Sequence, residues 1–549
     1  MFELKDHDGL GRLGVLTVNE KSIKTPNLAV VVNPNELSIP PKEMMKDFGV
    51  DLIITNAYII KNSKKAEKIE RKGLHDFFNF PGLIYTDSGT YQMYSQGNAL
   101  ITNKETLDYQ EKLGSDIHTP LDLFTTPSDN KKIARFKLEE TVKRIKEVKT
   151  KNYSAPIQGG SYLELRKEAC KKVSKLPATV YPIGGIVPYM INYNFKQLVK
   201  VIIECKNHLP LNTPVHAFGA GHPMVFSLLT YAGIDLFDSA SYALYARNGK
   251  YVTETGTKKA EHLTSLPCTC PVCTSHKPRE LRKFKYLVRH NLHALMREVR
   301  VIRQAIQEDK LFELVYSRAM SHPNIYYALR WLLKNKELIA RHDPVRKRSA
   351  LFWTGGLSDE RPEIYYAMKQ VKSLGFRKVP RPLKLVYPFG QSLGWSVNYS
   401  KKKYDDLGKL RLIADYQFGK GAGKKLIPKS VRIIKTRNQR LHQVYLDDEL
   451  LFVVRARDGY CSLHSAGAER IKKYLKKVEA PEEFKKFYLK GRDVFAKHVV
   501  KCDDGIKPRM EAGVFVDKKL VAVGEALLSS QEMMGFNWGT AVKIREAIS

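Results

Sequence analysis

Residues 214–239 read PVHAFGAGHPMVFSLLTYAGIDLFDS and contain the repeating pattern that decides the fold. An apolar run at 214–218 ends in Gly219-Ala220-Gly221, and a second apolar run at 235–238 ends in Asp238-Ser239. Short apolar runs that end in Gly, Asp or Ser and alternate with helix-forming stretches indicate a parallel α/β sheet or barrel. We therefore expect a strand in each of the two runs.

The same pattern extends back along the chain to about residue 50. We expect further strands at 52–60, 83–86, 155–158 and 179–183, and helices at 132–149 and 195–207. At least six such units precede residue 245, and no GxGxxG turn opens the series. This combination favours an α/β fold of the (βα)8 TIM-barrel type over a doubly wound sheet.

In such a barrel, polar residues at the carboxyl ends of strands are the candidates for catalysis. Asp87 and Asp238 each follow a predicted strand, and each is followed by Ser. Two carboxylates in one barrel mouth can divide the roles of nucleophile and proton carrier. The alternative is that each aspartate caps the helix that follows it.

The charge balance points to a polyanionic partner. The chain has 92 Lys and Arg against 57 Asp and Glu, a net charge of +35, and residues 401–440 hold 13 of the cations against three Asp. We interpret this excess of positive charge as an indication that the protein binds nucleic acid. The basic block at 401–440 is equally consistent with an ordinary solvent-exposed surface. No window approaches a membrane span and the sequence MFELKDHDGL is unlike a signal peptide, so we expect no membrane association and a cytoplasmic location.

Three of the seven cysteines form a Cys268-Thr-Cys270-Pro-Val-Cys273 cluster with metal-ligand spacing. A tetrahedral zinc site needs a fourth ligand, and His276, His290 and His293 are nearby in the sequence. We choose His290 because it heads a helix-forming run that can fold back onto the cysteine loop, whereas His276 lies too near Cys273. A closed four-ligand site is structural, and we expect one Zn²⁺ per chain.

The remaining segments suggest a chain of several domains. We expect the barrel with its zinc-binding insertion at 1–345, a linker or first C-terminal domain at 346–400, a basic α+β domain at 401–473, and a small β-rich module at 474–549. The final module has strand patterns at 494–500, 513–516 and 519–523.

Six ordered motifs carry a family resemblance. They are Asp87-Ser88-Gly89, Asp116-Ile117-x3-Leu121-Asp122, Gln158-Gly159-Gly160, Gly184-Gly185-Ile186-Val187-Pro188, Phe237-Asp238-Ser239, and the cysteine cluster with His290. Together they resemble the archaeal type of tRNA-guanine transglycosylase, which acts in archaeosine biosynthesis. The module at 474–549, including Val523-Gly524-Glu525-Ala526, is similar to a PUA RNA-binding domain.

The resemblance implies exchange of the D-loop guanine at position 15 of tRNA for 7-cyano-7-deazaguanine (preQ0). It implies that Asp238 is the nucleophile, that Asp87 is the general acid and base, and that Asp122 reads the base edge. It further implies that Gln158, Gly184 and Gly185 complete the pocket. Tyr91, at a position where the family tends to carry Phe, would stack on the base. The resemblance also implies that the enzyme is a homodimer. The alternatives are a tRNA-binding or amidotransferring paralog that does not exchange bases, and a structural partner in an RNA-processing complex.

Overall fold

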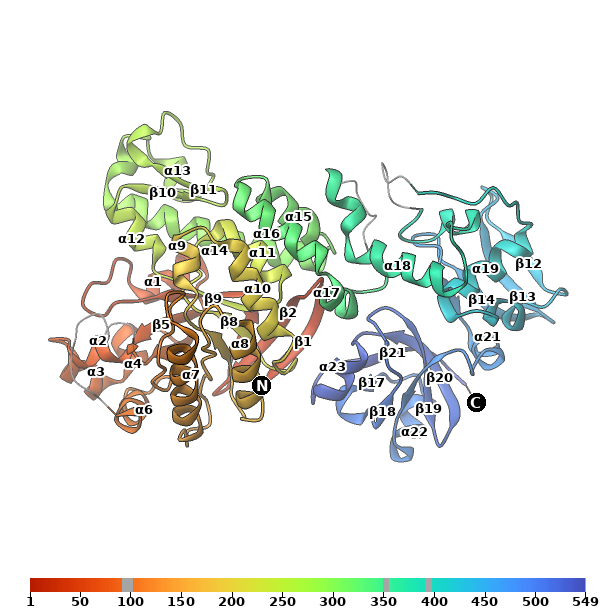
Figure 1. The fold of residues 1–549 in the computed structure, drawn as a ribbon, viewed down its shortest axis with the longest axis horizontal. Coiled ribbons are helices and arrows are strands. Elements are labelled where there is room, and N and C mark those ends of the chain that lie inside the picture. Colours follow the sequence, from red (N-terminus) through yellow and green to blue (C-terminus); the bar gives the residue numbers. More distant parts are fainter. Residues whose placement is uncertain (91–101, 349–354, 391–396, 549) are drawn as a thin grey trace. The chain divides into compact units, whose positions relative to one another are not determined.

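The computed structural model describes residues 1–90, 102–348, 355–390 and 397–548 (Figure 1). The chain divides into two compact units. The first unit contains residues 1–6 and 10–332, and the second contains residues 7–9 and 333–549. No helix in the described ranges combines the length and apolar character needed to cross a membrane.

The first unit is built around a parallel sheet with the strand order β6-β5-β4-β9-β8-β7. These strands are β4 (Asn27–Val31), β5 (Leu52–Asn56), β6 (Leu83–Asp87), β7 (Tyr181–Ile183), β8 (Val215–Ala217) and β9 (Leu236–Ser239). Short parallel bridges continue the pairing from β6 to Ile117, from His118 to Tyr153, and from Ser154 to Val180 beside β7. The eight parallel segments therefore form a closed ring, which confirms the predicted barrel.

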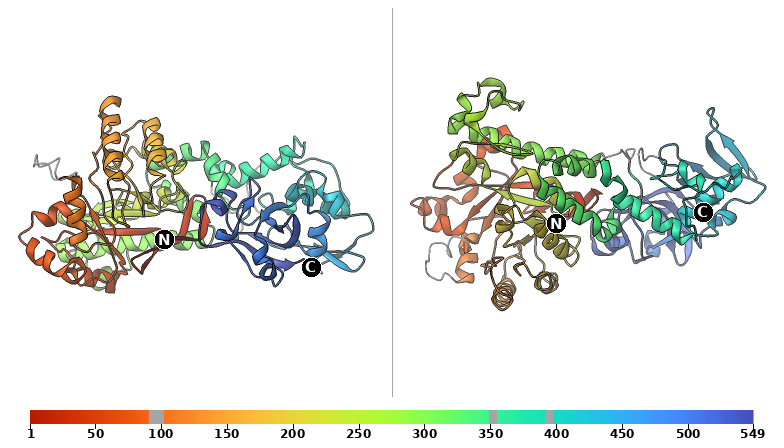
Figure 2. Two further views of the ribbon diagram at one scale, coloured as in Figure 1. Left: turned by 90° about the horizontal axis from the view of Figure 1, so that it is seen from below. Right: turned by 45° about the horizontal axis from the view of Figure 1, so that its top comes forward.

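Helices follow the strands and cover the outside of the ring (Figures 1 and 2). They are α1 (Pro41–Phe48), α2 (Ala57–Lys61), α3 (Ala66–Lys72), α4 (Leu74–Phe78), α6 (Asn103–Lys112), α7 (Lys131–Lys146), α8 (Leu163–Val173), α9 (Val187–Ile191), α10 (Phe195–Lys206), α11 (Pro223–Tyr231) and α12 (Ser241–Arg247). The predicted helices at 132–149 and 195–207 correspond to α7 and α10. In α10, Phe195, Leu198 and Ile202 are fully buried, as expected from their helical spacing.

Several predicted strand boundaries were wrong. The run at 52–60 ends as a strand at Asn56, because the Asn56 side chain accepts a hydrogen bond from the amide of Ile59 and begins α2. The run at 155–158 contributes only a single bridge at Ile157. The sequence patterns also missed β4 and an antiparallel N-terminal sheet formed by β1 (Phe2–Asp8), β2 (Gly11–Val18) and β3 (Lys21–Thr25).

An extension follows the last barrel strand. It consists of the hairpin of β10 (Lys250–Thr253) and β11 (Gly256–Lys259), the short helix α13 (Pro271–Ser275) and the long helix α14 (Phe284–Gln307). The helices α15 (Leu311–Ala319) and α16 (Pro323–Lys334) follow α14. Helix α14 contacts both α12 and β10, so it connects the hairpin to the barrel.

The second unit contains two β-sheets and the helices packed on them. Its helices are α17 (Glu337–His342), α18 (Pro362–Ser373), α19 (Asp406–Phe418), α20 (Ala422–Leu426), α21 (Ser465–Arg470), α22 (Lys485–Tyr488) and α23 (Ser530–Gly535). One sheet is antiparallel, with β12 (Arg432–Lys435), β13 (Leu441–Leu446), β14 (Glu449–Val454) and β15 (Cys461–Leu463) in order.

The other sheet has the order β17-β21-β20-β19-β16-β18. Its strands are β16 (Lys476–Glu479), β17 (Val494–Phe495), β18 (Lys501–Cys502), β19 (Glu511–Val516), β20 (Lys519–Ala526) and β21 (Thr540–Ala547). The predicted strand at 494–500 is thus only two residues long, and a 3-10 turn at Ala496–His498 follows it.

The two sheets of the second unit share a hydrophobic core. Phe515, Leu520 and Val523 from the β19–β20 hairpin belong to the same buried cluster as Leu451 and Phe452 of β14. Burial of this apolar surface holds the two sheets together.

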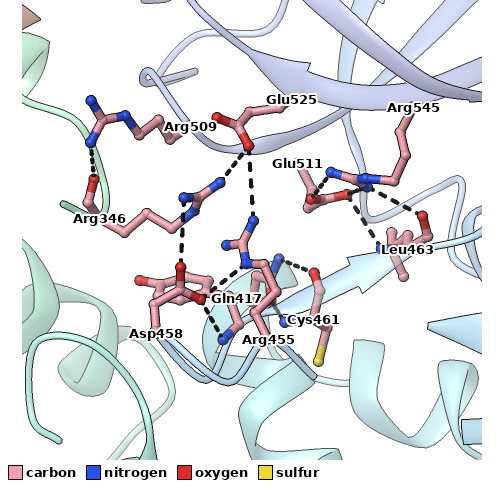
Figure 3. A network of polar contacts seen from close by, with 11 residues as sticks. Arg346, Gln417, Arg455, Asp458, Cys461, Leu463, Arg509, Glu511, Glu525 and Arg545 are labelled. Carbon is pink, nitrogen blue, oxygen red and sulfur yellow. Dashed lines mark hydrogen bonds and ion pairs between the residues drawn. The ribbon is translucent and has the colours of Figure 1, made fainter. Parts of the chain in front are cut away.

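Ion pairs join the same two sheets beside this core (Figure 3). Arg346 contacts both Glu525 of β20 and Asp458, which precedes β15. Arg545 of β21 makes two hydrogen bonds, of 2.7 and 2.8 Å, to the buried carboxylate of Glu511, and a third of 3.2 Å to the carbonyl of Leu463. Charged groups buried in this way are stable only when they are paired.

We predict that Arg545→Met destabilises the second unit by about 3 kcal/mol, because it leaves the Glu511 carboxylate buried without its partner. The matched control is Arg432→Met, whose partner Asp448 is 95% exposed and whose loss should cost less than about 1 kcal/mol. Differential scanning calorimetry of both variants tests the difference. Equal stabilities would show that the Arg545–Glu511 pair does not support this unit.

Candidate active site and metal centre

A cavity of about 600 Å³ opens at the carboxyl ends of the barrel strands. Its lining includes Asp87, Asp122, Gln158, Gly184, Gly185 and Asp238, which are all the predicted catalytic and substrate-binding residues that the structure describes. Tyr91 lies outside the described residues. The ring closure of the barrel explains this convergence, since the carboxyl ends of parallel strands meet on one face.

Asp238 lies near the end of β9 and is held by the neighbouring strand. Its Oδ1 atom accepts a hydrogen bond of 2.6 Å from the amide of Gly219 and lies 2.9 Å from Nε2 of His216. The next helix, α12, has Ala240 as its N-cap residue. Asp238 therefore does not cap this helix, and its carboxylate is directed to the cavity side of β8.

Asp87 ends β6 and sits where a carboxylate is poorly solvated. Burial and the nearby charge of Asp122 raise its pKa to about 7, against the opposing hydrogen bonds from the amide of Gly89 and the side chain of Asn56. The Asn56 bond joins Nδ2 to Oδ2 of Asp87 at 2.9 Å. A carboxyl group with this pKa can both donate and accept a proton near neutral pH.

Asp122 and Gln158 form a hydrogen-bonded pair on another side of the cavity. Nε2 of Gln158 donates to Oδ2 of Asp122 at 2.5 Å, and Oε1 of Gln158 accepts from both the amide and the hydroxyl of Thr125. These bonds fix the orientation of the Gln158 amide. Burial raises the pKa of Asp122 above its usual value.

Gly184 and Gly185 leave room for this pair. A Cβ atom on Gly184 would lie 2.4 Å from Nε2 of Gln158, and one on Gly185 would lie 2.5 Å from the carbonyl oxygen of Thr125. Gly185 also has a φ of +68°, in the left-handed region that favours glycine. Side chains at these positions would displace the Asp122–Gln158 pair.

Sequence reasoning missed the residues that hold the predicted ones in place. Asn56, Thr125, His216 and Gly219 each form a hydrogen bond to a predicted site residue. Conversely, Asp116, which belongs to one of the quoted motifs, does not line the cavity. It pairs with Lys21 at 2.9 Å and accepts a hydrogen bond from the amide of Ile84.

The structure brings Cys268, Cys270, Cys273 and His290 together in the extension after the barrel. Their ligand atoms lie within 4.8 Å of one another, and Nδ1 of His290 lies 3.3 Å from Sγ of Cys273 and 3.6 Å from Sγ of Cys270. Zinc bonds of about 2.3 Å to sulfur and 2.0 Å to nitrogen in a tetrahedron place these ligands about 3.5 Å apart. The donor set and its spacing therefore fit a metal.

Neighbouring groups orient the His290 ring for this role. Its Nε2 atom lies 3.0 Å from the carbonyl oxygen of Val252, so Nε2 carries the hydrogen and Nδ1 faces the thiols. The ring of Tyr251 stacks on the imidazole at 3.6 Å. His276 is not part of the group, and its Nδ1 atom lies 3.0 Å from the carbonyl oxygen of Val272.

The first unit is therefore an α/β-barrel enzyme domain with a cavity lined by three aspartates and a Cys3His group beside the barrel. Comparison with known families gives three matches: Queuine tRNA-ribosyltransferase over residues 6–324, the patch-forming domain C2 of tRNA-guanine transglycosylase over 408–477, and a PUA domain over 476–548.

Relatives match along the entire chain. The tRNA-guanine(15) transglycosylases of Pyrococcus abyssi and Pyrococcus furiosus are each 40% identical over 100% of this chain and 98% of their own length. That of Methanothermobacter thermautotrophicus is 33% identical, again over 100% of this chain and 98% of its own. The chain belongs to the tRNA-guanine(15) transglycosylase family of pentosyltransferases.

We predict that Cys270→Ser releases bound metal and lowers the melting temperature, because binding energy at a closed site contributes to folding. Elemental analysis should give one zinc per wild-type chain. His290→Ala should lose the metal, whereas His276→Ala and Cys502→Ser, which alter a histidine and a thiol outside the group, should retain it. Metal loss in His276→Ala with retention in His290→Ala would contradict the assignment.

Proposed function

We propose that this protein exchanges the guanine at position 15 of tRNA for 7-cyano-7-deazaguanine by double displacement. The observation that carries the proposal is the placement of Asp87, Asp122 and Asp238 around one cavity. The three carboxyl groups differ in their hydrogen-bond partners, so they can perform different tasks. Membership of the family supports the choice of tRNA as the substrate.

In the first step the Asp238 carboxylate attacks C1′ of the ribose. The new C–O bond forms as the bond from C1′ to the guanine nitrogen breaks, and the electron pair of that bond leaves with the guanine. Asp87 supplies a proton to the leaving purine. A pKa of about 7 supports this role, because the group then carries a proton in a large fraction of molecules at neutral pH.

In the second step the incoming base displaces Asp238. Its ring nitrogen forms the new bond to C1′ and loses its proton to Asp87, while the C–O bond breaks and its electron pair returns to the Asp238 carboxylate. Asp87 ends the cycle protonated, as it began. The two steps use the same two carboxyl groups in opposite directions.

Asp122 and Gln158 recognise the base. A guanine-type purine presents an exocyclic amine beside a ring N–H, and one carboxylate can accept both hydrogen bonds. The two hydrogen bonds from Thr125 hold the Gln158 amide in one orientation, so its polar atoms are already in place to recognise the base. Gly184 and Gly185 let the base approach the backbone. In this proposal Tyr91, outside the described residues, stacks on the base.

The metal group has no part in these steps. A Zn²⁺ ion held by three thiolates and one imidazole is coordinatively closed and supplies structural stability. His290 and the three cysteines join the cysteine loop to α14, and Val252 and Tyr251 connect them to β10. We therefore propose a structural zinc site.

The second unit supplies contacts to tRNA in this proposal. The basic residues at 401–440 and the PUA match at 476–548 support it, since cationic surfaces contribute sequence-independent affinity for phosphate backbones. The domain boundaries expected at residues 345, 400 and 473 remain predictions. The homodimeric state also remains a prediction.

We predict that the wild-type protein forms a covalent adduct with tRNA that is retained on a denaturing gel, and that Asp238→Asn forms none. In single-turnover measurements the rate of adduct formation should fall as the pH rises through about 7. The reason is that Asp87, with its raised pKa, loses the proton that the leaving guanine needs. Asp87→Asn should bind tRNA but form adduct slowly at every pH.

An adduct that persists in Asp238→Asn and disappears in Asp87→Asn would show that the two roles are reversed. A protein that binds tRNA but forms no adduct and incorporates no labelled guanine would instead support the paralog that does not exchange bases. The control for tRNA binding is a filter assay with each variant at constant salt, because salt alone changes the affinity.

A further inference from the structure

His216 is the one histidine in contact with the Asp238 carboxylate among the residues described. We propose that His216 is a positioning residue: as a neutral imidazole it donates a hydrogen bond from Nε2 to Oδ1 of Asp238, so that Oδ2 is the oxygen that attacks the ribose. This inference rests on the proposed role of Asp238 as the nucleophile. Beyond that role, it states which oxygen of Asp238 attacks the ribose and that the His216 side chain determines this choice.

The barrel register places the two side chains together. Strands β8 and β9 are parallel neighbours, with His216 opposite Leu236 and Ala217 opposite Phe237. Residues alternate between the two faces of a strand, so His216 points to the opposite face from Val215 and Ala217. Its side chain is fully buried, and Nε2 lies 2.9 Å from Oδ1 of Asp238.

The surroundings of the imidazole define which nitrogen carries the hydrogen. Within the described part of the chain, Nδ1 of His216 is buried and has no hydrogen-bond partner. A buried N–H without an acceptor is rarer than a buried acceptor without a donor. The favoured form is therefore neutral, with the hydrogen on Nε2 and a lone pair on Nδ1.

Aromatic rings hold the imidazole in this orientation. The ring of Phe218 lies 4.9 Å from the His216 ring, and the ring of Tyr85 on β6 lies 5.8 Å away. Both rings are tilted relative to the imidazole, and Nε2 is directed at the Asp238 carboxylate. This packing holds the Nε2–H donor of His216 in place, so the donor does not have to reorient during the reaction.

The two oxygens of Asp238 are consequently different. Oδ1 accepts from His216 Nε2 and from the amide of Gly219, whereas Oδ2 has no partner in the described ranges. The two donors fix the rotation of the carboxylate and engage the lone pairs of Oδ1. Oδ2 keeps its lone pairs free and forms the bond to C1′.

The same arrangement serves both displacements. When Oδ2 bonds to C1′, Oδ1 becomes the carbonyl oxygen of the ester and keeps its two hydrogen bonds. When the incoming base breaks the ester bond, negative charge returns to the carboxylate, where the two donors stabilise it. His216 transfers no proton in either step.

The test compares two substitutions at His216. His216→Phe keeps an aromatic ring beside Tyr85 and Phe218 but has no donor, whereas His216→Gln can place an amide N–H near the former Nε2 position. We expect His216→Phe to lower the kcat of guanine exchange about 10- to 100-fold, the effect of losing a hydrogen bond to a charged group, with the KM for tRNA changed less than about twofold. His216→Gln should recover most of the lost kcat.

Adduct formation separates this inference from the proposed function. If Asp238→Asn still forms the adduct, the assignment of the nucleophile fails. If the adduct requires Asp238 but forms in His216→Phe at the wild-type rate, only the role of His216 fails. Equal loss of kcat in His216→Phe and His216→Gln would also overturn it. Should His216→Phe not fold, as judged by metal content and melting temperature, His216→Leu is the donor-free variant to compare with His216→Gln.

Discussion

Hydrogen bonding between neighbouring parallel strands closes the first unit into a ring, and the candidate site depends on this closure. Asp87 lies on β6 and Asp238 on β9, about 150 residues apart along the chain, yet both strands run in the same direction around the same ring. The ring places their carboxyl ends at one mouth. Local sequence alone does not bring these two side chains together.

Enclosure at the barrel mouth gives similar carboxyl groups different properties. Asp87 is buried beside the charge of Asp122, and its pKa rises to about 7. Asp122 is paired with an oriented glutamine amide, and Asp238 receives two hydrogen bonds on one oxygen. In water these groups would be equivalent, and the protein environment distinguishes them.

The sequence predicts the ends of β6, β7 and β9 to within one residue, because each apolar run is followed by Asp-Ser or Gly-Gly. It does not predict β4 or the bridges at Ile117 and His118, and it predicts a strand at 155–158 where only Ile157 forms a bridge, because such short pairings depend on neighbours far along the chain. It also does not single out His216, a polar residue inside an apolar run, since its contact with Asp238 on the adjacent strand is visible only in the structure. The roles proposed for Asp122 and Gln158 rest on the resemblance, since composition and periodicity do not predict them.

We propose that the barrel mouth is a purine site in which three carboxyl groups have separate tasks. A crystal structure of the protein with bound guanine tests it most directly. We expect the exocyclic amine and adjacent ring N–H of guanine to contact Asp122, with Gln158 beside them and Asp87 within hydrogen-bond distance of a ring nitrogen. Guanine bound away from Asp122, or a mouth that remains without guanine at saturating concentration, would contradict it.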